Sequence, residues 1–141
     1  MGIGKYPGTG TLKKIGGWIE VREIKFRAWE KSLQEIIPVH DIDFSSRQIN
    51  TNGAWRLFNE VELMQYTGLH DKNGKEIYEG DIVRTSPIDR PMIVKWDDKS
   101  ASICITNLEG RILCASIAWE VWVVIGNIYQ NPGLLEGDRT R

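Results

Sequence analysis

The chain has 141 residues, a hydrophobic content of 41%, a charged content of 26% and a formal net charge of −1. These are ordinary globular values, so the composition argues against general disorder, and the length fits one domain or two very small ones sharing a core. Residues 1–20 hold three lysines and one glutamate, so they carry +2 and the rest of the chain carries −3. A mildly acidic body argues against strong non-specific binding to nucleic acid, which needs clustered Lys and Arg.

No apolar run approaches the roughly 20 residues that a membrane-spanning helix needs, and residues 1–20 lack the apolar core of a signal peptide. The sequence therefore predicts a cytoplasmic protein without membrane contact. Its two cysteines, Cys104 and Cys114, are too few for a disulfide scaffold and lack the spacing of a metal site. We expect both to be free thiols of the core.

Residues 1–20 contain six glycines and show no hydrophobic periodicity, which predicts an irregular, disordered leader. Residues 21–66 then form an N-terminal strand-rich lobe. Alternation of apolar and polar residues or runs of β-formers predict its strands at 22–29, 39–44, 54–58 and 61–66. Polar residues 31–35 predict a turn, and Pro38 suits the start of the second strand better than its middle.

Two glycine-containing loops share one pattern and predict matching hairpin turns. Asp71-Lys-Asn-Gly-Lys75 and Asn107-Leu-Glu-Gly-Arg111 each have Asp or Asn first and glycine fourth, as in a type I turn followed by a glycine bulge. The loops are then 72–74 and 108–110, although Asn73-Gly74 also suits a two-residue type I′ turn. The second turn sets a register in which Cys104 lies directly opposite Cys114. Directly opposed Cβ atoms are about 4.5–5.5 Å apart, beyond the roughly 3.8 Å typical of disulfides.

Residues 67–135 form the second half, in which Gly80 separates the hairpin from a region dense in β-formers. Its five candidate strands are 81–85, 92–96, 100–106, 111–117 and 121–128. Short strands at this spacing favour a small closed or nearly closed barrel over residues 77–129, because closure removes exposed edges. The two halves can share one core.

Several motifs fall in the order seen in the YopX-like family of bacteriophage and prophage proteins, which the chain resembles. They are Val21-Arg-Glu-Ile-Lys-Phe-Arg-Ala-Trp29, Leu63-Met-Gln-Tyr-Thr-Gly-Leu69, Lys72-Asn-Gly-Lys-Glu-Ile-Tyr-Glu-Gly-Asp-Ile-Val83, Val124-Ile-Gly-Asn-Ile-Tyr129 and Asn131-Pro132. The resemblance implies a mainly β fold with a small SH3-type barrel, and it implies no catalytic residue. It begins at Val21, where members usually carry the initiator methionine. GUG encodes valine and also serves as a bacterial start codon, so residues 1–20 are either a disordered extension or a mis-assigned start.

Two acidic groups near histidines are candidates for a metal-dependent enzyme. In the first, His40 lies on the opposite face of a strand from Asp41, so these groups do not converge without a bend. In the second, His70 is the only nitrogen ligand, whereas a metal site needs three or four converging ligands. Its acidic neighbours are Asp71, Glu76, Glu79 and Asp81, and turn chemistry explains them better: Asp71 accepts backbone N–H bonds, while Glu79 and Asp81 frame Gly80. No nucleophile motif or phosphate loop is present. We therefore expect no catalytic, cofactor-binding or metal-binding residue.

Aromatic side chains supply the candidate interaction surface. It consists of Trp29, Trp55, Trp96, Trp119, Trp122 and Tyr78. Exposed aromatics serve as hot spots of protein interfaces or stack on single-stranded bases, whereas buried ones cover the ends of a small core. The preferred hypothesis is a non-enzymatic phage or prophage accessory protein that binds a host or phage protein, or a second copy of itself. The alternative is nucleic-acid binding through the basic residues Arg22, Lys25, Arg27, Arg84, Arg90 and Lys95.

Overall fold

The structure is a computed structural model that describes residues 11–14, 17–20, 22–85, 89–110, 112–114 and 121–136. The protein is mainly β, as predicted, with one 3₁₀ turn and one short helix in the described ranges. The strands are β1 (Thr11–Lys14), β2 (Gly17–Glu20), β3 (Phe26–Glu30), β4 (Glu35–Pro38), β5 (Asp41–Asp43), β6 (Gln48–Thr51), β7 (Ala54–Leu57), β8 (Val61–His70), β9 (Glu76–Tyr78), β10 (Asp81–Arg84), β11 (Pro91–Asp97), β12 (Ser102–Thr106), β13 (Ile112–Cys114) and β14 (Val123–Asn127). The helical pieces are η1 (Phe58–Glu60) and α1 (Gly133–Glu136).

The N-terminal lobe consists of two small antiparallel sheets. One has the order β4-β3-β8-β9, and the other has the order β5-β6-β7. The buried side chains of Ala28, Ile37, Ile49 and Val61 form the core between them. Ile49, on the central strand of the second sheet, is fully buried, because one face of that sheet packs against the first.

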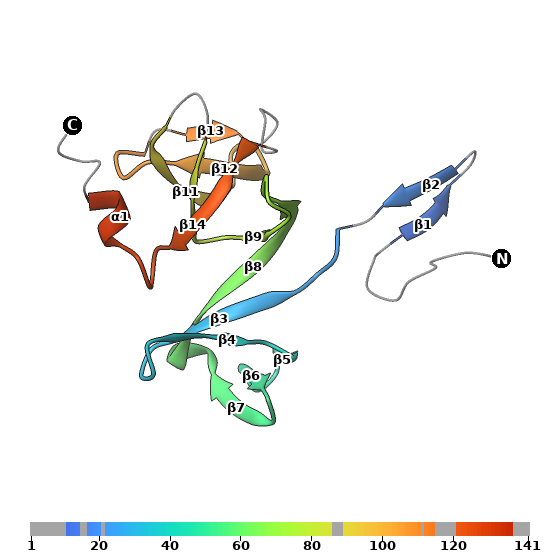
Figure 1. Cartoon of the computed structure of the whole chain (residues 1–141). Helices are drawn as coiled ribbons and strands as arrows, with labels where there is room; N and C mark the ends of the chain where they lie inside the picture. Colours follow the sequence, from blue (N-terminus) through green and yellow to red (C-terminus); the bar gives the residue numbers. More distant parts are fainter. Residues whose placement is uncertain are drawn as a thin grey trace.

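The second lobe is a curled five-stranded antiparallel sheet with the order β13-β12-β11-β10-β14 (Figure 1). Its concave side holds a separate core that gathers around Trp122, which is 1% exposed. The other buried members of that core are Ile77, Val83, Met92, Val94, Ile103 and Ile105. The five candidate strands of the second half thus correspond to the five strands of one sheet, and β10 is the first of them along the chain.

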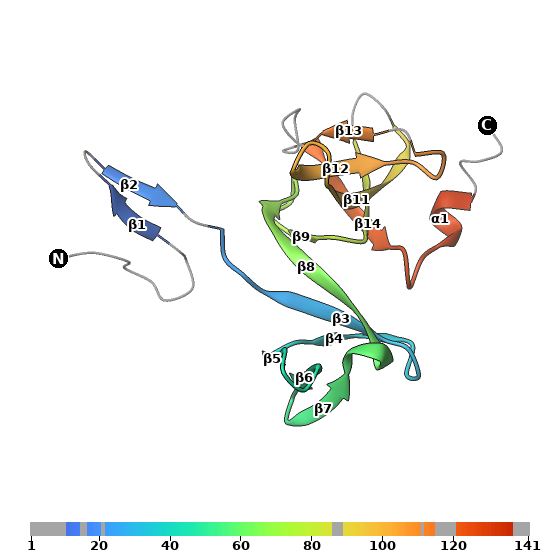
Figure 2. The same ribbon diagram turned by 180° about the vertical axis from the view of Figure 1, so that it is seen from behind.

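Strand β8 connects the lobes, because its two halves belong to different partners. Residues Val61 to Gln65 pair with β3, and Tyr66 and His70 pair with β9 across a register shift. Gly68 lies within that shift with a φ of +87°, a conformation that glycine adopts without steric cost. Figures 1 and 2 show β8 running from the N-terminal lobe up to the second lobe.

Both predicted turns have the three-residue loop. The Asp71 N–H donates to the Lys75 carbonyl at 2.7 Å, and the Gly74 N–H donates back to the Asp71 carbonyl at 2.9 Å. In the second turn the Gly110 N–H donates to the Asn107 carbonyl at 3.1 Å. Gly74 and Gly110 have φ of +84° and +85°. A type I′ turn needs a positive φ at both Asn73 and Gly74, but the φ of Asn73 is not positive, so this alternative for the first turn is wrong.

The register that follows from the second turn is confirmed, since Cys104 is the Cα partner of Cys114. Cys104 is buried, 0% exposed, and its Sγ lies 3.6 Å from the Ser102 hydroxyl. The side chain of Cys114 lies outside the described residues.

The leader differs from the irregular segment that the sequence predicts. β1 and β2 pair in register from Thr11↔Glu20 to Lys14↔Gly17. They form a two-stranded sheet of their own, and Figures 1 and 2 show it apart from the other sheets. Among the described strands this pairing adds none to the sheets of either lobe.

Candidate interaction surfaces

The structure corrects half of the predicted aromatic surface. Trp29 is 8% exposed, Trp122 is 1% exposed and Tyr78 is 9% exposed, so these three side chains belong to the interior. Trp55 and Trp96 are 46% and 42% exposed, on different lobes. Trp119 lies outside the described residues. An aromatic interaction surface among the described residues therefore retains only Trp55 and Trp96 from the predicted set.

The buried aromatics join the two lobes. Trp29 on β3 stacks on Tyr129, which follows β14, with ring centroids 5.9 Å apart and planes 14° apart. Tyr78 on β9 packs against Tyr66 at 5.4 Å and carries the Arg27 guanidinium 4.5 Å above its ring. These contacts bring β3, β8, β9 and the end of β14 into one joint, which is held by stacking and cation–π attraction.

A buried ion pair lies at the centre of this joint. Asp81 is 0% exposed and pairs with Arg27 from the other lobe, and it also accepts the Tyr78 N–H at 2.8 Å. Burial raises the pKa of Asp81, and the attraction of Arg27 opposes that rise. Glu79 and Asp81 do frame Gly80, whose φ is +92° and whose N–H donates to the Val94 carbonyl. Asp81 therefore serves as a structural carboxylate of the joint.

Gly126 and Asn131, two residues that carry the family resemblance, have a steric explanation. A Cβ at position 126 would lie 2.5 Å from Asn131 Oδ1, so only glycine leaves room for that side chain. Asn131 Oδ1 accepts the Asn127 N–H at 3.1 Å, and Asn127 Oδ1 accepts the Tyr129 N–H at 3.0 Å. This turn fixes Tyr129 where it meets Trp29.

The acidic group around His70 is a hydrogen-bonded network on the surface of the joint. Glu76 pairs with Lys25 and accepts the Tyr78 hydroxyl at 3.1 Å. Burial alone would raise the pKa of Glu76, but Lys25 and the Tyr78 hydroxyl outweigh it and lower that pKa. Burial and the Glu76 carboxylate raise the pKa of Tyr78 to about 12. Both groups thus keep one protonation state near neutral pH, as a structural network does.

Two further carboxylates near the histidines, Asp71 and Asp43, accept hydrogen bonds from backbone N–H groups. Asp71 accepts from Asn73 and Lys75 within its turn and from Val124 on β14 at 2.9 Å, so the predicted turn role is confirmed. Asp43 accepts from Ser45, and His40 Nε2 lies 2.9 Å from Asn52 Oδ1. In the described part of the chain, no three His, Cys, Asp or Glu side chains gather closely enough to hold a metal ion.

Carboxylates also pair with several of the predicted basic residues. Lys25 and Arg27 pair with Glu76 and Asp81, and Arg84 lies 3.3 Å from Asp89 Oδ1. The six basic residues are spread over several segments: Arg22 and Lys25 precede β3, Arg27 is on β3, Arg84 is on β10, Arg90 precedes β11 and Lys95 is on β11. Pairing and dispersal do not produce the continuous basic surface that phosphate backbones require.

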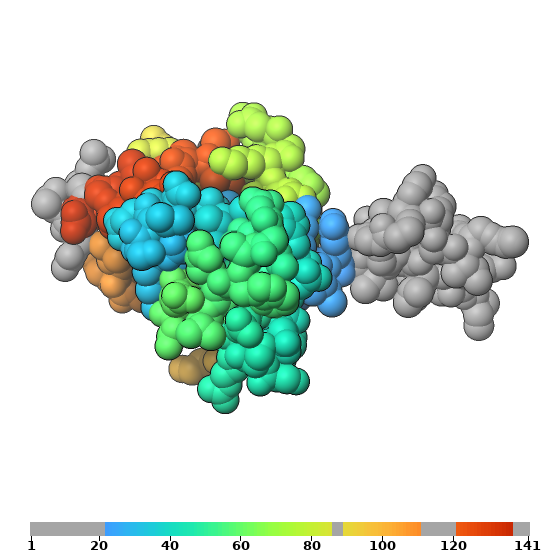
Figure 3. Space-filling model, turned by 90° about the horizontal axis from the view of Figure 1, so that it is seen from below, coloured from blue at the N-terminus to red at the C-terminus, as the bar shows by residue number. Residues whose placement is uncertain are grey.

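One sheet face carries exposed apolar side chains, and we name it the β5–β7 face. Strand register aligns Asp41 with Asn50 and Trp55, and Asp43 with Gln48 and Leu57. Trp55 and Leu57 are each 46% exposed, and Phe44 in the adjoining turn is 74% exposed. Phe44 packs edge-on against Phe58 at 6.2 Å. Figure 3 shows the atoms of 41–60, in cyan to green, at the front of the molecule when seen from below.

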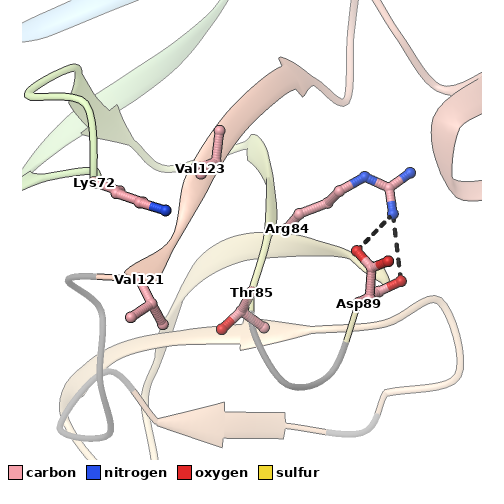
Figure 4. A pocket seen from close by; sticks show the side chains of 6 residues that line it. All are labelled: Lys72, Arg84, Thr85, Asp89, Val121 and Val123. Atoms are coloured by element: carbon pink, nitrogen blue, oxygen red, sulfur yellow. Dashed lines mark hydrogen bonds and ion pairs between the residues drawn. The ribbon is translucent and has the colours of Figure 1, made fainter.

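A pocket of about 470 Å3 lies on the second lobe (Figure 4). It is lined by Lys72, Arg84, Thr85, Asp89, Val121 and Val123. Turn 72–74, the end of β10 and the start of β14 supply most of these residues. The turn lies beside β14 because the Lys72 N–H donates to the Trp122 carbonyl at 2.8 Å. Sequence reasoning did not single out Lys72, Thr85, Phe44 or Leu57. Strand alternation could have identified Leu57, because it lies on the same face of β7 as Trp55. The pocket residues could not be identified in this way, because only the tertiary fold brings them together.

These features define a small, mainly β protein of two lobes built on one shared strand, with its motifs concentrated at the joint. Its sequence matches the model of the YopX protein family over residues 25–136, and the chain belongs to that family. It is 27% identical to the SPbeta prophage-derived uncharacterized protein YopX of Bacillus subtilis (strain 168), over 79% of this chain and 96% of that protein. The crystal structure of protein EF1440 from Enterococcus faecalis superposes with a TM-score of 0.60 at 28% identity, over 82% of this chain and 99% of that one.

In the described part of the chain, no helix combines the length and apolar character needed to cross a membrane.

Proposed function

We propose that the protein is a cytoplasmic, non-enzymatic phage or prophage accessory protein that binds another protein through the β5–β7 face. The exposure of Trp55 and Leu57 on one sheet face, together with Phe44 in the adjoining turn, is the observation that carries this proposal. Tryptophan is enriched among interface hot spots, and aromatic side chains bring large contact area at low entropy cost. The prophage origin of the Bacillus subtilis relative supports the cellular context.

The chemistry of the face defines its partner. Asp41 and Asp43 lie on the same face as Trp55 and Leu57, and Asp41 is exposed with no hydrogen bond or ion pair in the described structure. A complementary segment therefore carries an aliphatic or aromatic side chain for the apolar cluster and a Lys or Arg beside it. An arginine fits best, since it both pairs with Asp41 and stacks on the Trp55 ring.

The test compares two matched tryptophan variants. Tagged wild-type protein, Trp55→Ser and Trp96→Ser are used to capture proteins from a bacterial host lysate, and the captured protein is then purified and titrated directly. We expect Trp55→Ser to weaken that direct binding by at least 10-fold, in line with hot-spot truncations of about 2 kcal/mol, and Trp96→Ser to leave it unchanged. If Trp96→Ser abolished capture of the partner and Trp55→Ser left it intact, this result would contradict the assignment to the β5–β7 face.

Two alternatives are outcomes of the same experiment. Capture that disappears on nuclease treatment, together with tight, salt-sensitive mobility shifts with DNA or RNA, would favour nucleic-acid binding instead; we expect weak or no shift at physiological salt, because the basic residues are dispersed and partly paired. A second copy as the partner would appear as a concentration-dependent dimer in light scattering, which Trp55→Ser would dissolve.

We further infer that the curled five-stranded sheet is a barrel of the SH3 type. Its support is the antiparallel order β13-β12-β11-β10-β14 around one core, with an additional closing contact at the free edge of β14. There the Val124 N–H donates to Asp71 and the Trp122 carbonyl accepts from Lys72, so turn 71–75 covers that edge.

A further inference from the structure

The pocket on the second lobe contains two polar groups without partners. The Lys72 ammonium makes no ion pair or hydrogen bond in the described structure, although the Lys72 backbone is held to Trp122. Thr85 is only 9% exposed, and its hydroxyl likewise has no hydrogen bond there. Figure 4 shows the Lys72 ammonium turned into the pocket and the Thr85 hydroxyl on the Val121 side. Among the described residues Arg27 Nε is the buried side-chain atom without a hydrogen-bond partner, so the Thr85 hydroxyl is accessible from the pocket and can donate to a ligand.

The second cation of the pocket is already paired. Arg84 lies 3.3 Å from both the carbonyl oxygen and Oδ1 of Asp89, and Figure 4 shows its guanidinium turned away from Lys72. Two cations and one carboxylate give the described lining residues a net charge of +1, and the positive charge without a carboxylate partner among them is on Lys72. One cation and one hydroxyl match a monoanion. A strongly hydrated phosphate dianion would need more donors.

Two valines line the same pocket and select the rest of the ligand. Val121 and Val123 form an apolar wall beside Lys72, so a bare inorganic ion would leave that wall in contact with water. We propose that the pocket binds a carboxylate carried by a short branched aliphatic group. The carboxylate accepts from the Lys72 ammonium and the Thr85 hydroxyl, and the aliphatic group packs on the valines. This site is on the other lobe and does not rest on the β5–β7 face.

Such a carboxylate has two sources, a free small acid or the C-terminal residue of a polypeptide. A volume of about 470 Å3 lies within the range of ligand sites and exceeds what a five-carbon acid fills. The experiment therefore titrates ¹⁵N-labelled full-length protein with isovalerate, with the peptide acetyl-Gly-Ala-Val, with the C-terminal amide of that peptide and with inorganic phosphate. The amide shifts of Lys72, Thr85 and Val123 report binding.

We expect the peptide acid to bind with a dissociation constant of about 1 mM, as suits a ligand of its size, and its amide to bind at least 10-fold more weakly. Lys72→Gln weakens binding by about 10-fold, because it removes the only charge-assisted donor that is open. Thr85→Val weakens it by about 3- to 10-fold through one lost hydrogen bond. The control Lys95→Gln, on the outer part of β11, leaves the affinity unchanged. Tighter binding of the peptide than of isovalerate assigns the chain terminus, and the reverse assigns the free acid.

The proposal is overturned if neither acid shifts the pocket amides at 50 mM, or if the amide binds as well as the acid. It is also overturned if phosphate competes equally and Lys72→Gln and Lys95→Gln weaken binding alike, since this result means adventitious anion binding only. Lys72 is an exposed residue of a turn, so its substitution leaves folding intact and a spectrum of the variant verifies it. Thr85→Val gives an independent measure at the buried side of the same pocket.

Discussion

At the scale of single residues, Arg27 and Asp81 show how the two lobes depend on each other. Arg27→Met keeps most of the apolar stem but leaves the Asp81 carboxylate unpaired and buried. We expect this substitution to lower the free energy of unfolding by about 3–5 kcal/mol at pH 7, the usual cost of breaking a buried ion pair. Denaturant titration followed by tryptophan fluorescence measures it. Lys31→Met is the matched control, because it removes the exposed Lys31–Glu62 pair and costs less than about 1 kcal/mol.

The pH dependence of Arg27→Met distinguishes lost charge pairing from lost packing. Burial raises the pKa of Asp81 in the folded protein, and without Arg27 that pKa rises further. A raised folded-state pKa favours folding at low pH and loses that contribution as pH rises through it. The deficit of Arg27→Met is therefore greatest at neutral pH and shrinks toward pH 4. A deficit that is constant over this range would mean that packing on Tyr78, not charge, explains the effect.

Gly126 gives a second test at this scale. Gly126→Ala places a Cβ against the Asn131 side chain and displaces it from the Asn127 N–H. We expect a loss of about 1–3 kcal/mol, the cost of an unsatisfied buried donor, with a lower urea midpoint at unchanged slope. Gly133→Ala is the control, since nothing lies within 4 Å of the added methyl group and position 133 begins helix α1. Equal losses in the two variants would refute the steric argument.

At the scale of elements, turn 71–75 both reverses the chain and covers the edge of β14. Asp71→Ala removes the acceptor of three backbone N–H groups, two within the turn and one on Val124. We expect the free energy of unfolding to fall by about 2–3 kcal/mol at pH 7, because hydrogen bonds to a charged acceptor are stronger than those to a neutral one. Asp97→Ala is the control, because it removes a solvent-exposed carboxylate that accepts from Ser100 within its own turn, and we expect a much smaller loss of stability than for Asp71→Ala.

The stability difference between wild type and Asp71→Ala should also depend on pH in a definite direction. Burial alone would raise the pKa of Asp71, but the N–H donors of Val124, Lys75 and Asn73 outweigh burial and lower it. A lowered folded-state pKa stabilises the protein above the unfolded value of about 3.9, and this stabilisation is lost as pH falls through the folded pKa. The difference between wild type and Asp71→Ala thus narrows below about pH 4. Hydrogen exchange at Val124 should quicken in the variant.

The same elements show how far sequence reasoning reaches. Glycine in a fixed turn pattern determined both three-residue loops and the Cys104–Cys114 register, because those depend on local geometry. Five of the described strands were missed, namely β1, β2, β4, β6 and β9. β6 has a single buried apolar side chain, Ile49, between amides, and β9 is three residues long. Pro38 ends β4 instead of starting a strand, which an edge position permits, since no partner needs its N–H.

Burial of the aromatics was beyond sequence reasoning for a physical reason. Trp55 and Trp122 both lie among β-formers, yet one is 46% exposed and the other 1% exposed. Strand alternation tells which residues share a face, but not which face another sheet covers. The pocket around Lys72 has the same cause: its lining comes from three segments that only the tertiary fold brings together.

At the scale of the whole molecule, each lobe has its own core and β8 belongs to both. The cores around Ile49 and Trp122 have no member in common, and a third cluster of Met64, Tyr66 and Tyr78 lies between them. Because the joint combines aromatic stacking with a buried ion pair, we expect the lobes to unfold together. The predicted division near residue 66 falls within β8, so the boundary divides a strand that both lobes use.

The leader is the part of the molecule whose removal tests this view of the fold. β1 and β2 pair only with each other, and they extend neither lobe's sheet. We therefore expect a chain that starts with Met in place of Val21 to melt within about 2 °C of the full-length protein, since a loss of 1 kcal/mol would already shift the midpoint by several degrees. Differential scanning calorimetry of both chains measures it. A decrease of many degrees would show that the leader packs on the body and contributes to its stability.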